Sequence, residues 1–154
     1  MKWITREKAR VDRIACPWLI RKFVDRDAEF LYVPGDQVLE VARREGATPY
    51  DVPGAELTHF EKDGQEYVTF DAVIRAYRLS DPALLDLAEI VRVADGGSGS
   101  RPEAAGLEAA ATGFRQIARD DIENQRLQFP LYDALYAYCQ WRIEKGGKLE
   151  HTGR

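Results

Sequence analysis

The segment from Val11 to Phe23 combines acidic, basic, thiol and aromatic side chains that ordinary helix packing does not require. A helix that begins at Pro17 would present free backbone N–H groups and a partial positive charge at its first turn, and both attract anions. Arg13 would add a bidentate pair of donors to an oxyanion, and Asp12 would orient its guanidinium group. The segment therefore predicts one wall of a binding site for a small inorganic anion, formed by Asp12, Arg13, Cys16, Trp18 and Arg21.

The same residues also fit a purely structural interpretation. Asp12 and Arg13 would form a local salt bridge, while Arg21 and Lys22 would extend along the protein surface. A thiol at a helix N-terminus beside Arg13 would have a lowered pKa and would be reactive, whereas a lone cysteine is more commonly a small buried hydrophobic residue. The sequence leaves both alternatives open for Cys16.

His59 is a second position where chemistry is expected, because the other histidine, His151, lies in the polar C-terminal tail. Asp71 follows a predicted hairpin at a strand-to-helix junction, and Asp95 ends a predicted helix, where a carboxylate is unfavourable against the helix dipole. One histidine with carboxylates suits manganese or iron(II), and the Cys/His patterns of structural zinc are absent from the sequence. We predict a metal site of His59, Asp71 and Asp95 that holds Mn, Fe or Zn. The alternative is a half-buried strand histidine and two capping or surface acids.

The elements that must position these residues alternate in the N-terminal half and become helical after a Gly/Ser-rich stretch at 96–102. Strands are predicted at 2–5, 29–33, 56–60 and 66–70, the last two joined as a hairpin through Lys62-Asp63-Gly64. Helices are predicted at 17–25, 36–45, 71–77, 82–95, 102–118 and 121–145, the last one interrupted near Pro130. The predicted fold class is α+β, with a small N-terminal mixed sheet, packed helices and an all-helical C-terminal half. We expect a single domain, residues 1–146, and a flexible tail, 147–154.

Composition excludes several classes of protein. The chain has 154 residues, a net charge of −4 and 45% hydrophobic residues, which suits one globular domain. No apolar run approaches the roughly 18 residues that span a membrane, and the N-terminus lacks the apolar core of a signal peptide. Cys16 and Cys139 form no spaced motif, so we expect reduced thiols and a cytoplasmic location. The acidic body lacks a helix-turn-helix pattern, which argues against direct nucleic-acid binding by this chain.

Several stretches, taken in order, resemble the C-terminal domain of the ChrB family of chromate-resistance proteins. The most distinctive is DRIACPWLIR at 12–21, and the others are FLYVP at 30–34, ELTH at 56–59, TFDA at 69–72, IVRVAD at 90–95 and YDALYA at 132–137. The resemblance implies a cytoplasmic protein linked to chromate or metal-oxyanion stress, in a family described as regulators of chromate-efflux genes. Two departures fall near the predicted metal site: residues 60–65 replace a shorter turn, and Asp71 stands where many relatives have Glu.

These observations support three functional hypotheses. In the first, a chromate-resistance-associated domain binds a metal ion or an oxyanion between the N-terminal segment and the His59 hairpin, for sensing or detoxification. In the second, His59 and two carboxylates hold a metal with water at an open position, as in a metal-dependent enzyme. In the third, the chain is an interaction module of a chromate-responsive regulator whose last helix packs on a partner protein or, in a homodimer, on its own copy, through four aromatic residues: Tyr132, Tyr136, Tyr138 and Trp141. The sequence does not decide whether the protein is an enzyme.

Overall fold

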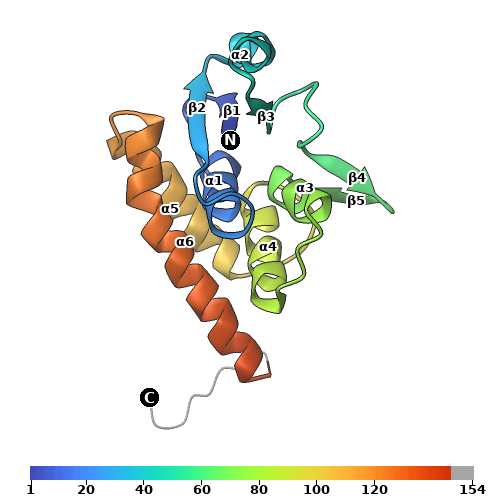
Figure 1. Ribbon diagram of the computed structural model, residues 1–154. Coiled ribbons are helices and arrows are strands. Elements are labelled where there is room, and N and C mark those ends of the chain that lie inside the picture. The colour runs from blue at the N-terminus through green and yellow to red at the C-terminus, as the bar shows by residue number, and fades with distance from the viewer. Residues whose placement is uncertain (147–154) are drawn as a thin grey trace.

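The computed structural model describes residues 1–146 and contains a three-stranded parallel sheet near the N-terminus. Strand β1 (Lys2–Arg6) is central, with β2 (Glu29–Val33) and β3 (Thr48–Pro49) on either side of it. Parallel neighbours need long crossover connections, which are supplied by α1 (Asp12–Phe23) and α2 (Val38–Glu45). Figure 1 shows α2 on one side of this sheet and the main body of helices on the other.

The alternation of side chains along β1 connects the sheet to two hydrophobic cores. Ile4 belongs to the smaller core, whose other buried members come from α2 and its neighbouring loops: Val38, Val41, Ala42, Ala47 and Val52. Trp3 points the opposite way and joins the larger core, to which α1 contributes Ile14, Leu19 and Ile20. Because this larger core also takes residues from α3 to α6, the sheet and the helical body pack as one unit.

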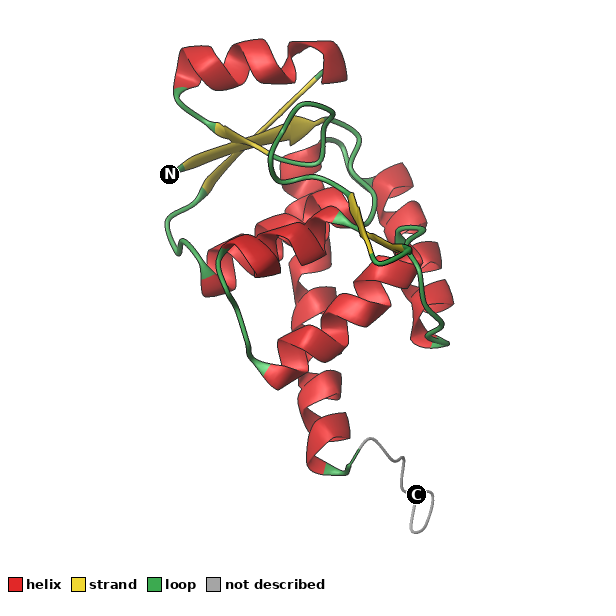
Figure 2. Ribbon diagram, turned by 90° about the vertical axis from the view of Figure 1, so that its right-hand side faces the viewer, coloured by secondary structure: helices red, strands yellow, loops and turns green. Residues whose placement is uncertain are grey.

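The second half begins with a short antiparallel hairpin, β4 (Phe60–Lys62) and β5 (Gln65–Tyr67), and continues as helices. These are α3 (Thr69–Ala76), α4 (Pro82–Ala94), α5 (Glu103–Ile117) and α6 (Asp121–Glu144). The side chains of Asp81 and Asp120 accept backbone hydrogen bonds at the starts of α4 and α6, as N-cap residues do. Figure 2 shows α2 above the three-stranded sheet and the other helices below it.

The first helix corrects the prediction that a helix begins at Pro17. It begins at Asp12, and Pro17 lies inside it. Proline has no N–H, so the carbonyl of Arg13 lacks its usual partner four residues later in the helix. The hydroxyl of Tyr32 on β2 donates to that carbonyl over 2.8 Å instead. As a consequence Cys16 is not at a helix N-terminus, and the premise of a reactive thiol there is wrong.

Other predicted boundaries also change. The hairpin strands are shorter than predicted, and His59 lies in the loop immediately before β4 instead of within a strand. A short 3-10 turn at Gly35–Gln37 precedes α2, and the two-residue strand β3 was not predicted. Helix α6 runs without interruption through Pro130.

The predicted α+β class and the helical C-terminal half are confirmed. The strands form two separate sheets, one parallel and one antiparallel. The predicted flexible tail, 147–154, lies outside the described residues. Within residues 1–146, none of the helices combines the length and the apolar character that crossing a membrane requires.

Candidate functional site

A cavity of about 320 Å³ opens where α1, the loop after β3, the loop before β4 and the end of α4 meet. It lies beyond the carboxyl ends of β1 and β3, the edge at which open parallel sheets commonly bind ligands. Its polar lining is strongly charged and comprises Arg6, Arg10, Asp12, Arg13, Asp51, His59 and Asp95. Acidic and basic groups therefore share one small pocket.

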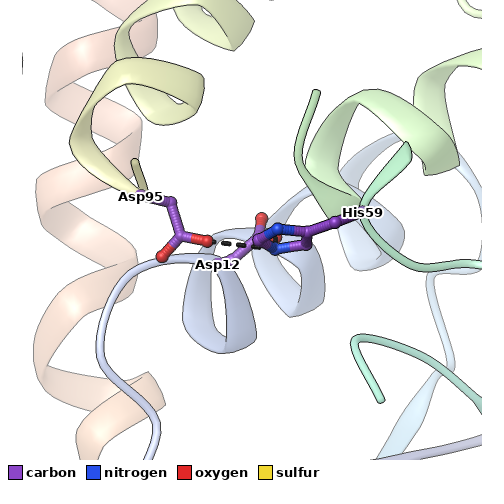
Figure 3. A group of neighbouring side chains, drawn as sticks. All are labelled: Asp12, His59 and Asp95. Carbon is purple, nitrogen blue, oxygen red and sulfur yellow. Dashed lines mark ion pairs between the residues drawn. The ribbon is translucent and has the colours of Figure 1, made fainter. Parts of the chain in front are cut away.

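Three carboxylates converge on a single imidazole nitrogen. The Nε2 atom of His59 lies 3.3 Å from Oδ2 of Asp12, 3.2 Å from Oδ1 of Asp51 and 3.3 Å from Oδ2 of Asp95. The ligand atoms of Asp12, His59 and Asp95 all lie within 4.8 Å of one another. Figure 3 shows the side chains of Asp12, at the start of α1, and Asp95, at the end of α4, directed at the ring of His59. The four residues come from segments up to 83 positions apart in sequence.

Asp12 is held by the N-terminus of α3. The residue before that helix is Val68, whose side chain has no acceptor, so the first N–H groups of α3 need another partner. Asp12 supplies it: Oδ2 accepts from the N–H of Thr69 over 2.8 Å, and Oδ1 accepts from the N–H of Phe70 over 3.1 Å. The thiol of Cys16, one turn along α1, donates to Oδ1 over 3.4 Å. Asp12 thus acts as a capping group for a helix that begins 57 residues later.

The other two carboxylates are each held from a second side. Asp51 has a left-handed backbone with φ of 54°, and its Oδ1 accepts from the Thr69 hydroxyl over 2.8 Å. Its second oxygen, Oδ2, lies 3.5 Å from Nε of Arg13. Oδ1 of Asp95 lies 4.0 Å from a terminal nitrogen of Arg10. Each carboxylate therefore directs one oxygen toward His59 and leaves the other to a donor outside the group.

Burial and like charge dominate the electrostatics. Burial raises the pKa of the Asp12 carboxyl, and the carboxylates of Asp51 and Asp95 raise it further, against a lowering by the hydrogen bond to His59. Hydrogen bonds to Asp12, Asp51 and Asp95 raise the pKa of the His59 imidazole far above its usual range. Burial, followed by the charge of Asp12, raises the pKa of the Cys16 thiol. Cys16 is therefore a neutral donor to Asp12 at physiological pH.

His59 has more carboxylate neighbours than a simple ion pair requires. A single imidazole needs one carboxylate partner, whereas three carboxylates surround Nε2 at nearly equal distances. One nitrogen and three carboxylate oxygens from rigidly placed segments form a mixed donor set of the kind that binds first-row divalent metals. His59 is 47% exposed at its side chain, so the group is open to the cavity on one side.

Comparison with known proteins places the chain in a family. The model of the ChrB C-terminal domain matches residues 3–139. The chain belongs to the ChrB C-terminal domain family. It is also 34% identical over 141 residues to Protein ChrB of Cupriavidus metallidurans, an alignment that covers 89% of this chain and 40% of that protein. The chain thus spans two fifths of the length of that relative, and no solved structure matches it.

Membership of the ChrB C-terminal domain family confirms the resemblance found in the sequence. The residues predicted from the sequence to form the site divide into two groups. Asp12, Arg13, His59 and Asp95 line the same cavity, and Cys16 lies directly behind Asp12.

Three other predicted site residues lie elsewhere. Asp71 receives two hydrogen bonds from Arg92, at 2.7 and 3.0 Å, and a third from the N–H of Val68. Trp18 on α1 donates to Asp133 over 2.9 Å and packs against Tyr132 of α6. Arg21 donates to the carbonyl of Ala28 and lies over the rings of Phe30 and Phe129. None of the three lines the cavity.

The sequence analysis missed Asp51, Arg6 and Arg10. A signal for two of them existed: Arg6 ends β1 and Asp51 follows β3 by two residues, so both lie at the carboxyl edge of a parallel sheet. That signal depends on recognising β3, which has only two residues. The homodimer through α6 stays a prediction. Tyr132 is fully buried, and the hydroxyls of Tyr136 and Tyr138 donate to Asp81 and Glu103 of the same chain.

Proposed function

We propose that this domain binds one divalent metal ion through His59, Asp12, Asp51 and Asp95, and that the metal and the neighbouring arginines together bind a tetrahedral oxyanion. The observation that supports the proposal is the convergence of three carboxylate oxygens on Nε2 of His59 at 3.2 to 3.3 Å. A metal would take the place of the proton that His59 shares with these oxygens.

The donor set selects among metals. One imidazole and three carboxylates contain no thiolate, and carboxylates favour manganese while imidazole also suits iron and zinc. Structural zinc sites use four Cys or His ligands, which this group does not offer. Affinity for divalent ions at a given N/O site generally rises from Mn²⁺ through Fe²⁺ and is higher for Zn²⁺, so we expect all three ions to bind, Mn²⁺ most weakly, with open coordination positions facing the cavity.

Charge supports an anion as the second ligand. The three carboxylates carry −3, Arg10 and Arg13 beside two of them add +2, and the proton on His59 brings the sum to 0 in the metal-free protein. A divalent cation would change the sum to +1, and Arg6, which lines the same cavity, would raise it to +2. A pocket of this size and charge suits a dianion that coordinates the metal and accepts hydrogen bonds from guanidinium groups. In the setting of chromate resistance, chromate is the dianion that we propose.

Calorimetry tests the metal. Protein freed of metal by chelation is titrated with Mn²⁺, and one equivalent is expected to bind. His59→Ala and Asp51→Asn should each weaken this binding by more than the roughly 10–100-fold that outer partners of a metal contribute. Asp36→Asn, an exposed aspartate on the 3-10 turn, is the matched control and should bind as the parent does. Absence of Mn²⁺, Fe²⁺ and Zn²⁺ binding, or binding unchanged in His59→Ala, would overturn the proposal.

A second titration tests the anion. Chromate and redox-inert sulfate are added to the Mn²⁺-loaded protein and to the metal-free protein. Both anions should bind more tightly when the metal is present, because the metal adds positive charge to the pocket and offers an open coordination position. Arg6→Gln should weaken anion binding, whereas Arg119→Gln, at a fully exposed arginine paired with Glu123, should not. Equal anion binding by the two arginine variants would contradict the oxyanion part while leaving the metal part intact.

A further inference from the structure

We propose that Thr69 is a positioning residue that holds Asp51 in the orientation required for metal binding and ties it to Asp12. The inference rests on the proposed metal centre. Thr69 is fully buried at the first position of α3. Its Oγ1 donates to Oδ1 of Asp51 over 2.8 Å, and its backbone N–H donates to Oδ2 of Asp12 over 2.8 Å. One residue therefore contacts the oxygens of two ligands that both face His59.

Asp51 needs an external partner because of where it lies in the chain. Its backbone adopts a left-handed conformation in the loop after β3, and its N–H is fixed by the carbonyl of Leu57 over 2.8 Å. Besides His59, which lies 3.2 Å from Oδ1, the carboxylate beyond this fixed backbone has two partners: the Thr69 hydroxyl on Oδ1, and Arg13 on Oδ2 at 3.5 Å. A guanidinium group favours both oxygens of a carboxylate at once. Without the hydroxyl, Arg13 would draw Oδ1 away from His59.

Asp12, unlike Asp51, does not depend on the Thr69 hydroxyl for its orientation. Its carboxylate accepts from two backbone N–H groups of α3 and from the Cys16 thiol. A thiol is a weak donor, and the backbone donors remain whatever side chain occupies position 16 or position 69. The hydroxyl of Thr69 is therefore expected to matter through Asp51, and the thiol of Cys16 is expected to matter little for metal binding.

Three variants separate these roles. Thr69→Val removes the hydroxyl and keeps the shape and the backbone N–H. Thr69→Ser keeps the hydroxyl, and Cys139→Ala is the matched control, because residue 139 on α6 is as deeply buried as residue 69 and does not line the cavity. The probe is Mn²⁺ alone, followed by calorimetry and by the electron paramagnetic resonance spectrum of the bound ion. Urea unfolding of each variant shows that the compared proteins are folded.

Thr69→Val is expected to raise the dissociation constant for Mn²⁺ by roughly 10–100-fold, the usual effect of removing an outer partner of a ligand. Its Mn²⁺ spectrum should change as Asp51 leaves the ion. Thr69→Ser should restore both properties, and Cys139→Ala should bind Mn²⁺ as the parent does. If Thr69→Val does not fold, Thr69→Ala gives the same test without the added methyl group.

Two results would refute the positioning role of Thr69, and each can be distinguished from a failure of the proposed metal site. Equal Mn²⁺ affinities and spectra for Thr69→Val and Cys139→Ala would show that Thr69 acts only in packing. A Thr69→Ser variant as weak as Thr69→Val would show that the hydroxyl is not the operative group. If the parent protein itself binds no metal, the proposed function fails instead.

Discussion

Substitution of Asp71 and of Asp95 by asparagine should have opposite effects on stability and on metal binding. Asp71 and Asp95 were both predicted to bind metal, but the structure gives them different partners. Asp71 is buried and bound by Arg92 through two hydrogen bonds, while Asp95 lies beside His59 and faces the cavity. We expect Asp71→Asn to lower stability and leave metal binding intact, and Asp95→Asn to abolish metal binding and leave stability intact.

The structure sets the size of each effect. Asp71 and Arg92 are 8% and 18% exposed at their side chains, so their pair is shielded but not fully buried. Breaking a fully buried pair costs about 3–5 kcal/mol, so Asp71→Asn should cost roughly 2–3 kcal/mol and lower Tm by roughly 4–12 °C. Asp95 lies 3.3 Å from the half-exposed His59 and 4.0 Å from Arg10, and the two like charges of Asp12 and Asp51 near it offset part of these attractions. Its neutralisation should therefore change the free energy of unfolding by less than about 1 kcal/mol.

The assay measures both properties on the same preparations. Urea unfolding gives the stability of the metal-free proteins, and titration with Mn²⁺ gives affinity and stoichiometry. Asp71→Asn should bind one equivalent of Mn²⁺ near the parental affinity at a temperature where it is folded. If Asp71→Asn is fully stable and binds no metal, Asp71 is a ligand and the assignment of Asp51 in its place is wrong.

Three further predictions concern residues around the site. Phe60 stacks on Tyr67 with ring centroids 4.9 Å apart and directly follows His59, so Phe60→Ala should cost about 1 kcal/mol in urea unfolding and weaken Mn²⁺ binding in calorimetry. Unchanged affinity would show that the stack does not position His59. Burial raises the pKa of Asp86, but hydrogen bonds from two arginines outweigh it and hold this pKa at about 2. The hydrogen bonds to Asp86 stabilise the folded protein fully above the unfolded pKa near 3.8, and this stabilisation is lost as pH falls toward 2. In urea unfolding the parent should therefore lose roughly 2 kcal/mol over this pH range, whereas Asp86→Asn should not. Trp18→Phe removes the hydrogen bond to Asp133 and should cost about 1 kcal/mol with unchanged Mn²⁺ binding; a large loss of metal affinity would return Trp18 to the site.

Local patterns were sufficient for much of the fold. Asp81-Pro82 marked the start of α4, and Gly46 marked the end of α2, because capping and left-handed termination depend on neighbouring residues alone. Pro17 led to a wrong prediction of the start of α1, because that prediction also used neighbouring residues alone. A proline favours the first turn of a helix, but its position inside α1 is tolerated because the freed carbonyl of Arg13 is satisfied by Tyr32 from a different strand.

The site was only half predictable, for a physical reason. His59 and Asp95 could be found from residue type and from an unfavourable position at the end of a helix. Asp71 was predicted because it follows a predicted strand, whereas no predicted element marked Asp51, since the two-residue strand β3 before it was not predicted. What separates them is the position of Arg92, which pairs with Asp71, and the path of the loop after β3, which brings Asp51 to His59. Both features depend on the tertiary structure and cannot be inferred from neighbouring residues in the sequence.

The position of Asp12 argues most directly that this group of residues serves a ligand. A helix needs one capping acceptor at its start, and a serine or aspartate at position 68 would supply it locally. The chain instead has Val68 there and uses a carboxylate from α1, which must be buried beside two other carboxylates and pays for it in desolvation. A capping role alone does not explain that cost. The same carboxylate can cap α3 with one side and bind a cation with the other, so the segments that carry the four proposed ligands come together only when α1, α3, α4 and the sheet are all in place. Metal binding would therefore report on, and stabilise, the folded domain as a whole.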